Sequence, residues 1–81
     1  MSHFAYMLRC ADNSLYCGYS VDPVAREKAH NSGKGAKYTR SRLPVTLVYF
    51  EKFDDKSNAL KREASLKKLT HKQKEELIQQ R

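Results

Sequence analysis

Five side chains of this sequence carry groups that could act together in one reaction. They are two phenols, a guanidinium, an imidazole and a carboxylate, on Tyr6, Tyr16, Arg26, His30 and Glu63. Cleavage of a phosphodiester needs an in-line nucleophile, positive charge on the phosphate oxygens and help for the leaving oxygen. Each residue alone is an ordinary surface or core residue, but together they could supply a base, a charge stabiliser and a metal ligand. The set therefore indicates a candidate site for phosphodiester cleavage.

Two segments rich in aromatic and apolar residues, 3–9 and 15–20, are separated by a short polar turn and predict a β-hairpin. A three-residue loop would place Asn13 in the left-handed conformation that asparagine tolerates. This loop length fixes the register of the two strands.

That register pairs Tyr6 with Gly18 and puts Tyr6 and Tyr16 on one face as diagonal neighbours, roughly 7–8 Å apart at the backbone. The glycine would leave open space above the strand for a phosphodiester, although it could equally mark a β-bulge. The same parity sends Cys10 and Cys17 to opposite faces, so both thiols are expected to be free.

A helix over about residues 23–31 is predicted, because Asp22 is a typical N-cap and is followed by proline at the first helical position. Gly33 is a plausible end signal for it. Arg26 and His30 are four residues apart, so they would project from one face of this helix.

The rest of the chain predicts one more strand and two more helices. The apolar segment 45–53 is expected to form a strand covered on both faces. A helix should follow over about residues 54–68, started by an aspartate pair. Thr70 and Gln73 have the spacing of a capping box for a last helix.

Glu63 falls among apolar positions of the helix expected over about 54–68, beside Leu60 and Leu66. An unpaired charge there is costly, so a cationic partner is expected. A bound metal ion would serve, but Arg62 and Lys67 border the same stripe, and an ion pair explains the glutamate about as well.

The segment between the first helix and the third strand is basic and contains no acidic residue. Its side chains could bind phosphates through charge and stack a base on an aromatic ring. A flexible basic connection without a ligand is the alternative. The candidate nucleic-acid-binding residues are Lys34, Lys37, Tyr38, Arg40 and Arg42.

Composition limits the class of protein. The 81 residues suffice for one small domain, and 16 Lys and Arg against nine Asp and Glu give a net charge of +7. This charge favours a polyanionic partner such as nucleic acid, although a merely soluble basic domain would share it. Two cysteines and the lack of a long apolar run predict a cytoplasmic protein that is not in a membrane.

Tyr6, the Tyr16-Cys17-Gly18 triplet, Arg26, His30 and Glu63 resemble the motif residues of the GIY-YIG nuclease superfamily in order and type. The likeness covers nearly the whole chain and is greatest to the small stand-alone bacterial members. It implies a single α+β domain over residues 1–81, with a three-stranded antiparallel sheet flanked by about three helices in the order β-β-α-β-α-α.

The resemblance also implies roles for the five residues. Tyr16 would act as general base or orient the attacking water, with Tyr6 positioned beside it. Arg26 would stabilise the charged phosphate, and Glu63 would hold the metal. His30 matches a histidine that some members use as a base or as a phosphate contact.

The resemblance implies a metal-dependent endonuclease acting on nucleic acid, with DNA, including structured or damaged DNA, as the expected substrate. One carboxylate suits a single divalent ion, Mg²⁺ or Mn²⁺. Two departures are Phe4-Ala5 in place of Gly-Ile and Tyr19 where several repair members have Lys. A nucleic-acid-binding module without turnover and a protein-interaction adaptor on the same scaffold stay open as alternatives.

Overall fold

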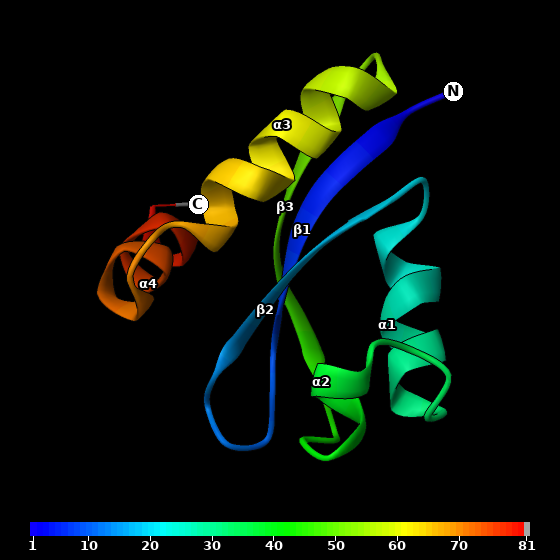
Figure 1. Ribbon diagram of the computed structural model, residues 1–81, viewed down its shortest axis with the longest axis vertical. Helices are drawn as coiled ribbons and strands as arrows, with labels where there is room; N and C mark the ends of the chain where they lie inside the picture. Colours follow the sequence, from blue (N-terminus) through cyan, green and yellow to red (C-terminus); the bar gives the residue numbers. More distant parts are fainter. Residues whose placement is uncertain (81) are drawn as a thin grey trace.

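Three strands and four helices form the part of the chain that the structure, a computed structural model, describes, residues 1–80. In chain order they are β1 (His3–Arg9), β2 (Leu15–Ser20), α1 (Pro23–Asn31), α2 (Lys37–Arg40), β3 (Thr46–Phe53), α3 (Lys56–Lys67) and α4 (His71–Gln79). The strands form one antiparallel sheet in the order β2-β1-β3. The sheet separates α1 and α2 on one side from α3 and α4 on the other (Figure 1). The expected α+β fold is confirmed.

The hairpin has the predicted register. Asn13 has a φ of 70°, and the Cys10 amide donates to the Ser14 carbonyl across the turn at 2.8 Å. Tyr6 pairs with Gly18, as the three-residue loop requires. Since side chains alternate along a strand, the even-numbered residues of both strands share one face.

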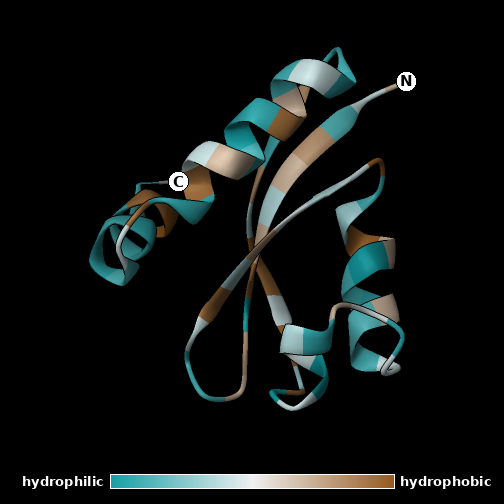
Figure 2. Ribbon diagram, in the orientation of Figure 1, coloured by the Kyte–Doolittle hydropathy of each residue, from teal (hydrophilic) through white to brown (hydrophobic). Residues whose placement is uncertain are grey.

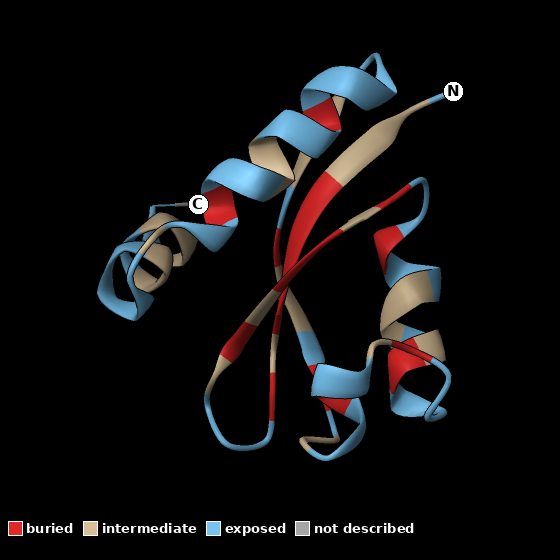
Figure 3. Cartoon of the chain, viewed as in Figure 1, coloured by how far each residue is buried: buried red, intermediate tan, exposed pale blue. Residues whose placement is uncertain are grey.

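Each face of the sheet has its own small core. The face toward α1 buries Tyr6, Leu8, Cys10 and Val45, and the face toward α3 buries Ala5, Met7, Cys17, Tyr49 and Leu66. The buried residues are most numerous on β1 and β2, and two positions are buried on each of α1 and α3 (Figure 3). Hydrophilic residues cover most of α3 and α4 (Figure 2). The two cysteines are free and lie in different cores, as predicted.

Side-chain caps fix where the helices begin. The Asp22 carboxylate accepts from the Ala25 amide at the start of α1, and Asp55 accepts from the Asn58 amide at the start of α3. Thr70 and Gln73 form the predicted capping box of α4. An N-cap of this kind stabilises a helix by about 1 kcal/mol.

A bidentate ion pair anchors the last helix to the sheet. The Arg9 guanidinium on β1 donates to both carboxylate oxygens of Glu75 on α4, at 2.6 and 2.7 Å. This pair holds the pKa of the Glu75 carboxyl below its ordinary value, and His71 adds a smaller effect in the same direction. Leu77 and Ile78 of α4 pack against the core on that side of the sheet.

Two sequence predictions about these elements are wrong. β3 is an edge strand in which only Tyr49 is buried, whereas the four central residues of β1 are all buried. The strand covered on both faces is therefore β1. The basic segment also contains a short helix, α2, which no pattern had indicated because four residues are too few to show a helical period.

Candidate active site

A chain of hydrogen bonds links the sheet to α1 and α2. The Tyr6 hydroxyl lies 3.3 Å from Nε2 of His30, whose Nδ1 lies 2.8 Å from the Thr39 hydroxyl. The Thr39 hydroxyl in turn donates to the Ala36 carbonyl at 2.8 Å. The Ala36 amide also donates to Nδ1 of His30, at 3.4 Å. Both ring nitrogens of His30 are therefore engaged, and which of them carries the proton depends on the tautomer.

Two glycines leave the space that the hydrogen-bonded side chains of Tyr6 and His30 occupy. A Cβ atom on Gly18 would lie 2.5 Å from the Tyr6 hydroxyl oxygen, and one on Gly35 would lie 2.1 Å from Nδ1 of His30. The open space expected above Gly18 is thus filled by the Tyr6 ring rather than left for a ligand. Gly35 and Thr39 were missed by sequence analysis, because only the folded chain brings them to His30.

Of the two candidate tyrosines, Tyr6 and Tyr16, Tyr16 is the more accessible. Its ring packs against the His30 ring at a centroid distance of 5.3 Å and lies nearly parallel to the Tyr38 ring at 6.1 Å. The Tyr16 side chain is only partly buried, and its hydroxyl has no hydrogen-bond partner within residues 1–80. Tyr6, by contrast, is 1% exposed.

The two predicted charges act on the same buried phenol. Burial raises the pKa of Tyr6, the nearby Arg26 guanidinium lowers it in part, and Tyr16 and Glu63 raise it further. Burial also lowers the pKa of His30, and the positive charge of Arg26 adds to that effect. Tyr6 therefore stays protonated and His30 stays neutral near neutral pH. Tyr6 is thus linked to the other four candidate residues, to His30 by their contact and to Tyr16, Arg26 and Glu63 through its shifted pKa.

Glu63 approaches this group from the other side of the sheet. It lies on α3, which packs against β1 and against the edge strand β2. Its carboxylate also raises the pKa of the Cys17 thiol, after the larger effect of burial. Cys17 faces the α3 side of the sheet, as Glu63 does, whereas Tyr6 lies in the core on the α1 side.

Glu63 pairs with Lys67 at 3.5 Å, the ion pair that was one of its two expected explanations. The Glu63 side chain is 19% exposed and that of Lys67 56%. Within residues 1–80 no three His, Cys, Asp or Glu side chains gather closely enough to hold a metal ion by themselves. The only carboxylate of the candidate set is Glu63.

The basic segment presents most of its side chains to solvent. Lys34, Lys37 and Arg40 are exposed. Arg42 differs, because it pairs with Asp12 at 3.1 Å and its guanidinium covers the Tyr38 ring at 3.9 Å from the centroid. Its direct contacts are therefore within the protein.

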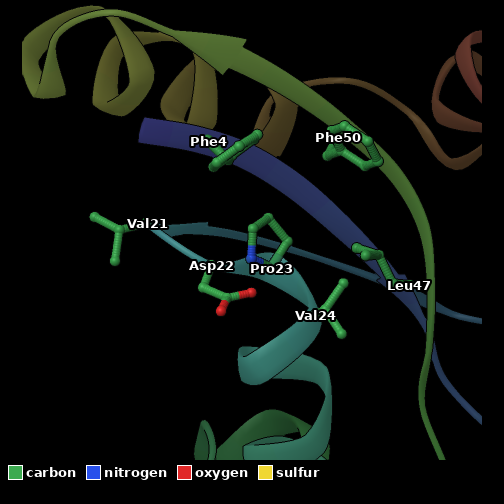
Figure 4. A pocket seen from close by; sticks show the side chains of 7 residues that line it. All are labelled: Phe4, Val21, Asp22, Pro23, Val24, Leu47 and Phe50. Atoms are coloured by element: carbon green, nitrogen blue, oxygen red, sulfur yellow. The ribbon is translucent and has the colours of Figure 1, made fainter. Parts of the chain in front are cut away.

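A separate apolar groove of about 260 Å³ lies between the first turn of α1 and the sheet (Figure 4). The only ionisable group in its lining is Asp22, whose carboxylate caps α1. The groove therefore offers no set of groups for bond cleavage. It is lined by Phe4, Val21, Asp22, Pro23, Val24, Leu47 and Phe50.

The fold and this group of side chains define a small α+β domain whose motif residues come from a hairpin, the following helix and a later helix. Residues 2–76 match the GIY-YIG catalytic domain family, and the chain belongs to it. The family indicated by the sequence motifs is thereby confirmed. None of the helices within residues 1–80 is long and apolar enough to cross a bilayer.

Similar proteins share nearly the whole chain. A UPF0213 protein of Staphylococcus aureus is 52% identical over 80 residues, covering 99% of this chain and 98% of that one. A UPF0213 protein of Staphylococcus haemolyticus is 49% identical over 79 residues, covering 98% and 96%. The solution NMR structure of a UPF0213 protein from Bacillus halodurans is 44% identical, with a TM-score of 0.64 over 100% of this chain and 86% of that one.

The buried His30 should make the protein less stable in mild acid. The unfolded chain takes up a proton near the ordinary histidine pKa of about 6.5, whereas the folded chain, with its lowered pKa, does not. The free energy of unfolding is therefore highest at pH values above about 6.5. At lower pH it decreases by up to about 1.4 kcal/mol per pH unit until the folded-state pKa is reached. Urea unfolding between about pH 7.5 and 5.5 measures this slope.

The matched variant for this measurement is His30→Gln, which cannot titrate. It is expected to be less stable overall but to lose most of the slope, and His3 and His71 are unchanged in both proteins. An equal slope in the two proteins would show that another group is responsible.

Proposed function

We propose that this protein is a divalent-metal-dependent endonuclease that hydrolyses phosphodiester bonds in DNA, including structured or damaged DNA. The observation that carries the proposal is the shared environment of Tyr6. The charges of both Arg26 and Glu63 shift the pKa of its buried phenol, and Tyr16 and His30 are its neighbours. Membership of a nuclease family supports the same conclusion.

Glu63 is the residue we assign to a single Mg²⁺ or Mn²⁺ ion. Its carboxylate pairs with the Lys67 ammonium at 3.5 Å, and a bound metal ion would take the place of that cation. A site with one carboxylate suits a small hard cation that keeps most of its waters and meets phosphate oxygens directly. When bound, such an ion would withdraw charge from the phosphate and raise the acidity of nearby water.

Arg26 and Tyr16 are assigned to the reacting groups. The Arg26 guanidinium would stabilise the charge that grows on the phosphate oxygens. The Tyr16 hydroxyl, which is accessible and has no partner within residues 1–80, would orient or deprotonate the attacking water. Positive charge beside the attacking water, from Arg26 or a bound metal ion, would assist its deprotonation.

Tyr6 and His30 are assigned positioning roles. Both are almost completely buried, and each is held by the other. A buried, neutral His30 is poorly placed for the base or phosphate-contact role that the resemblance implied. We propose instead that His30 fixes the Tyr6 phenol, which in turn fixes Tyr16 and Arg26.

The proposal is tested by cleavage of supercoiled, single-stranded and branched DNA in Mg²⁺ or Mn²⁺, with and without a chelator. The parent protein should cut only with metal. Tyr16→Phe should cut about 100-fold more slowly, because a positioned proton acceptor contributes 10²–10⁴-fold to such reactions. Its control is Tyr19→Phe, which removes a neighbouring phenol that faces the other side of the sheet and binds His3 at 2.7 Å.

Equal losses in Tyr16→Phe and Tyr19→Phe would remove Tyr16 from the reaction. Binding of DNA without any metal-stimulated cleavage by the parent would overturn the enzymatic proposal. It would favour a non-catalytic nucleic-acid-binding module, which the net charge of +7 would also explain.

A further inference from the structure

A pocket of about 330 Å³ adjoins the group of residues assigned to cleavage and shares only Tyr16 with it. Its size is at the lower end of the roughly 300–1,000 Å³ typical of small-ligand sites. Its lining comes from β2, α2, α3 and α4. The lining residues are Leu15, Tyr16, Cys17, Tyr38, Lys67 and Lys74.

One part of this pocket is an aromatic surface that is held in place. Tyr38 is 41% exposed, yet the Arg42 guanidinium covers its ring at 3.9 Å and donates to its carbonyl at 2.7 Å. Arg42 is itself fixed by Asp12 from the β1–β2 turn. Tyr16 also lies nearly parallel to the Tyr38 ring at 6.1 Å, so the ring is ordered without a ligand and a base would pack against its exposed part. A molecule that binds there loses less free energy in ordering the site.

The other part of the pocket is cationic. The ammonium groups of Lys74 and Lys67 both lower the pKa of the Cys17 thiol, opposing the larger effect of its burial. Both lysines line the pocket beside Cys17. Lys67 pairs with Glu63, but Lys74 has no ion pair within residues 1–80. The charge of Lys74 is therefore uncompensated, which favours an anion such as a phosphate.

We propose that this pocket receives an unpaired nucleotide of the DNA strand next to the bond that is cut, its base on the Tyr38 ring and its phosphate near Lys67 and Lys74. This inference rests on the proposed function and names its substrate class. A base within a continuous duplex is already stacked and paired, so it cannot occupy an aromatic pocket without leaving the helix. Single-stranded, flapped and branched DNA offer such a base at little cost.

The pocket also connects the substrate to Glu63. Lys67 is shared between the pocket lining and the ion pair with that carboxylate. A phosphate near Lys67 would compete with Glu63 for the ammonium. Binding of the nucleotide would then release the carboxylate for the metal, so that the two ligands favour one another.

The test compares the affinity of the protein for a short single-stranded oligothymidylate with its affinity for a blunt duplex hairpin of equal charge, by fluorescence anisotropy. Tyr38→Leu should lower the ratio of the single-strand to the duplex affinity about tenfold, the effect expected from loss of one stacking ring. Tyr38→Phe, which keeps the ring, should restore most of the ratio. Lys74→Gln should weaken single-strand binding and reduce its dependence on salt.

The control is Lys72→Gln, which removes an exposed lysine of α4 that does not line the pocket. Each variant is checked for folding by its thermal unfolding transition. A ratio that is equal in the parent and in Tyr38→Leu, or a parent that prefers the duplex, would overturn the pocket proposal. Metal-dependent cleavage that is lost in Tyr16→Phe would still support the nuclease, so the two proposals fail separately.

Discussion

Replacement of Glu63 by glutamine should lower the rate of metal-dependent DNA cleavage about 10³-fold while the fold is retained. A neutral amide has nearly the shape of the carboxylate but is a weak ligand for a hard cation, and Lewis-acid assistance is worth several kcal/mol. Each factor of ten in rate corresponds to about 1.4 kcal/mol. The measurement is single-turnover cleavage across a range of Mg²⁺ concentrations.

The fold should survive this change because, among residues 1–80, the Glu63 carboxylate has only one ion-pair partner, Lys67, whose side chain is mostly exposed. Such an ion pair, four residues apart on a helix, contributes only about 0.3–0.5 kcal/mol. Glu76→Gln is the matched control, because Glu76 is exposed on α4. If Glu63→Gln cut DNA as fast as the parent, the metal assignment would be wrong and a contaminating nuclease would have to be sought.

Replacement of Gly35 by alanine should reduce the free energy of unfolding by about 3 kcal/mol, the upper end of what overpacking a core usually costs. The new Cβ atom would lie 2.1 Å from Nδ1 of His30 and 2.8 Å from its Cα. His30 cannot move aside easily, because it is fully buried and bonded to Tyr6 and Thr39. Urea unfolding measures the loss.

Gly33→Ala provides the contrast for this prediction. Gly33 has a φ of +83°, but nothing lies within 4 Å of where its Cβ would be. Its replacement should cost only about 1–2 kcal/mol, the penalty of a left-handed conformation. A larger loss at Gly33 than at Gly35 would show that the close approach of Gly35 to His30 is not a strong constraint.

The features that sequence predicts correctly are those set by neighbouring residues. The three-residue loop at Asn13 alone determines that Tyr6 faces Gly18 and shares a face with Tyr16. The caps at Asp22 and Thr70 likewise depend on contacts three residues away. Local chemistry of this kind can be derived without a structure.

The features that sequence misses depend on residues far apart in the chain. The order β2-β1-β3 decides that β1 rather than β3 is buried, and no local pattern determines that order. Thr39 and Gly35 reach His30 only when α2 folds back on α1. Lys74 joins Tyr16 and Tyr38 only through the packing of α4. In each case tertiary packing, rather than propensity, makes the arrangement.

The ion pair between Arg9 and Glu75 fixes the position of α4, which carries one of the residues that line the proposed nucleotide pocket. Glu75 follows Lys74 directly, so the tether that docks this helix on the central strand also sets where the neighbouring ammonium stands. A charge on a freely swinging tail could attract a polyanion, but it could not hold one nucleotide in register with the scissile bond. If the proposed nucleotide pocket is correct, α4 would therefore form a fixed wall of it rather than a loose basic tail.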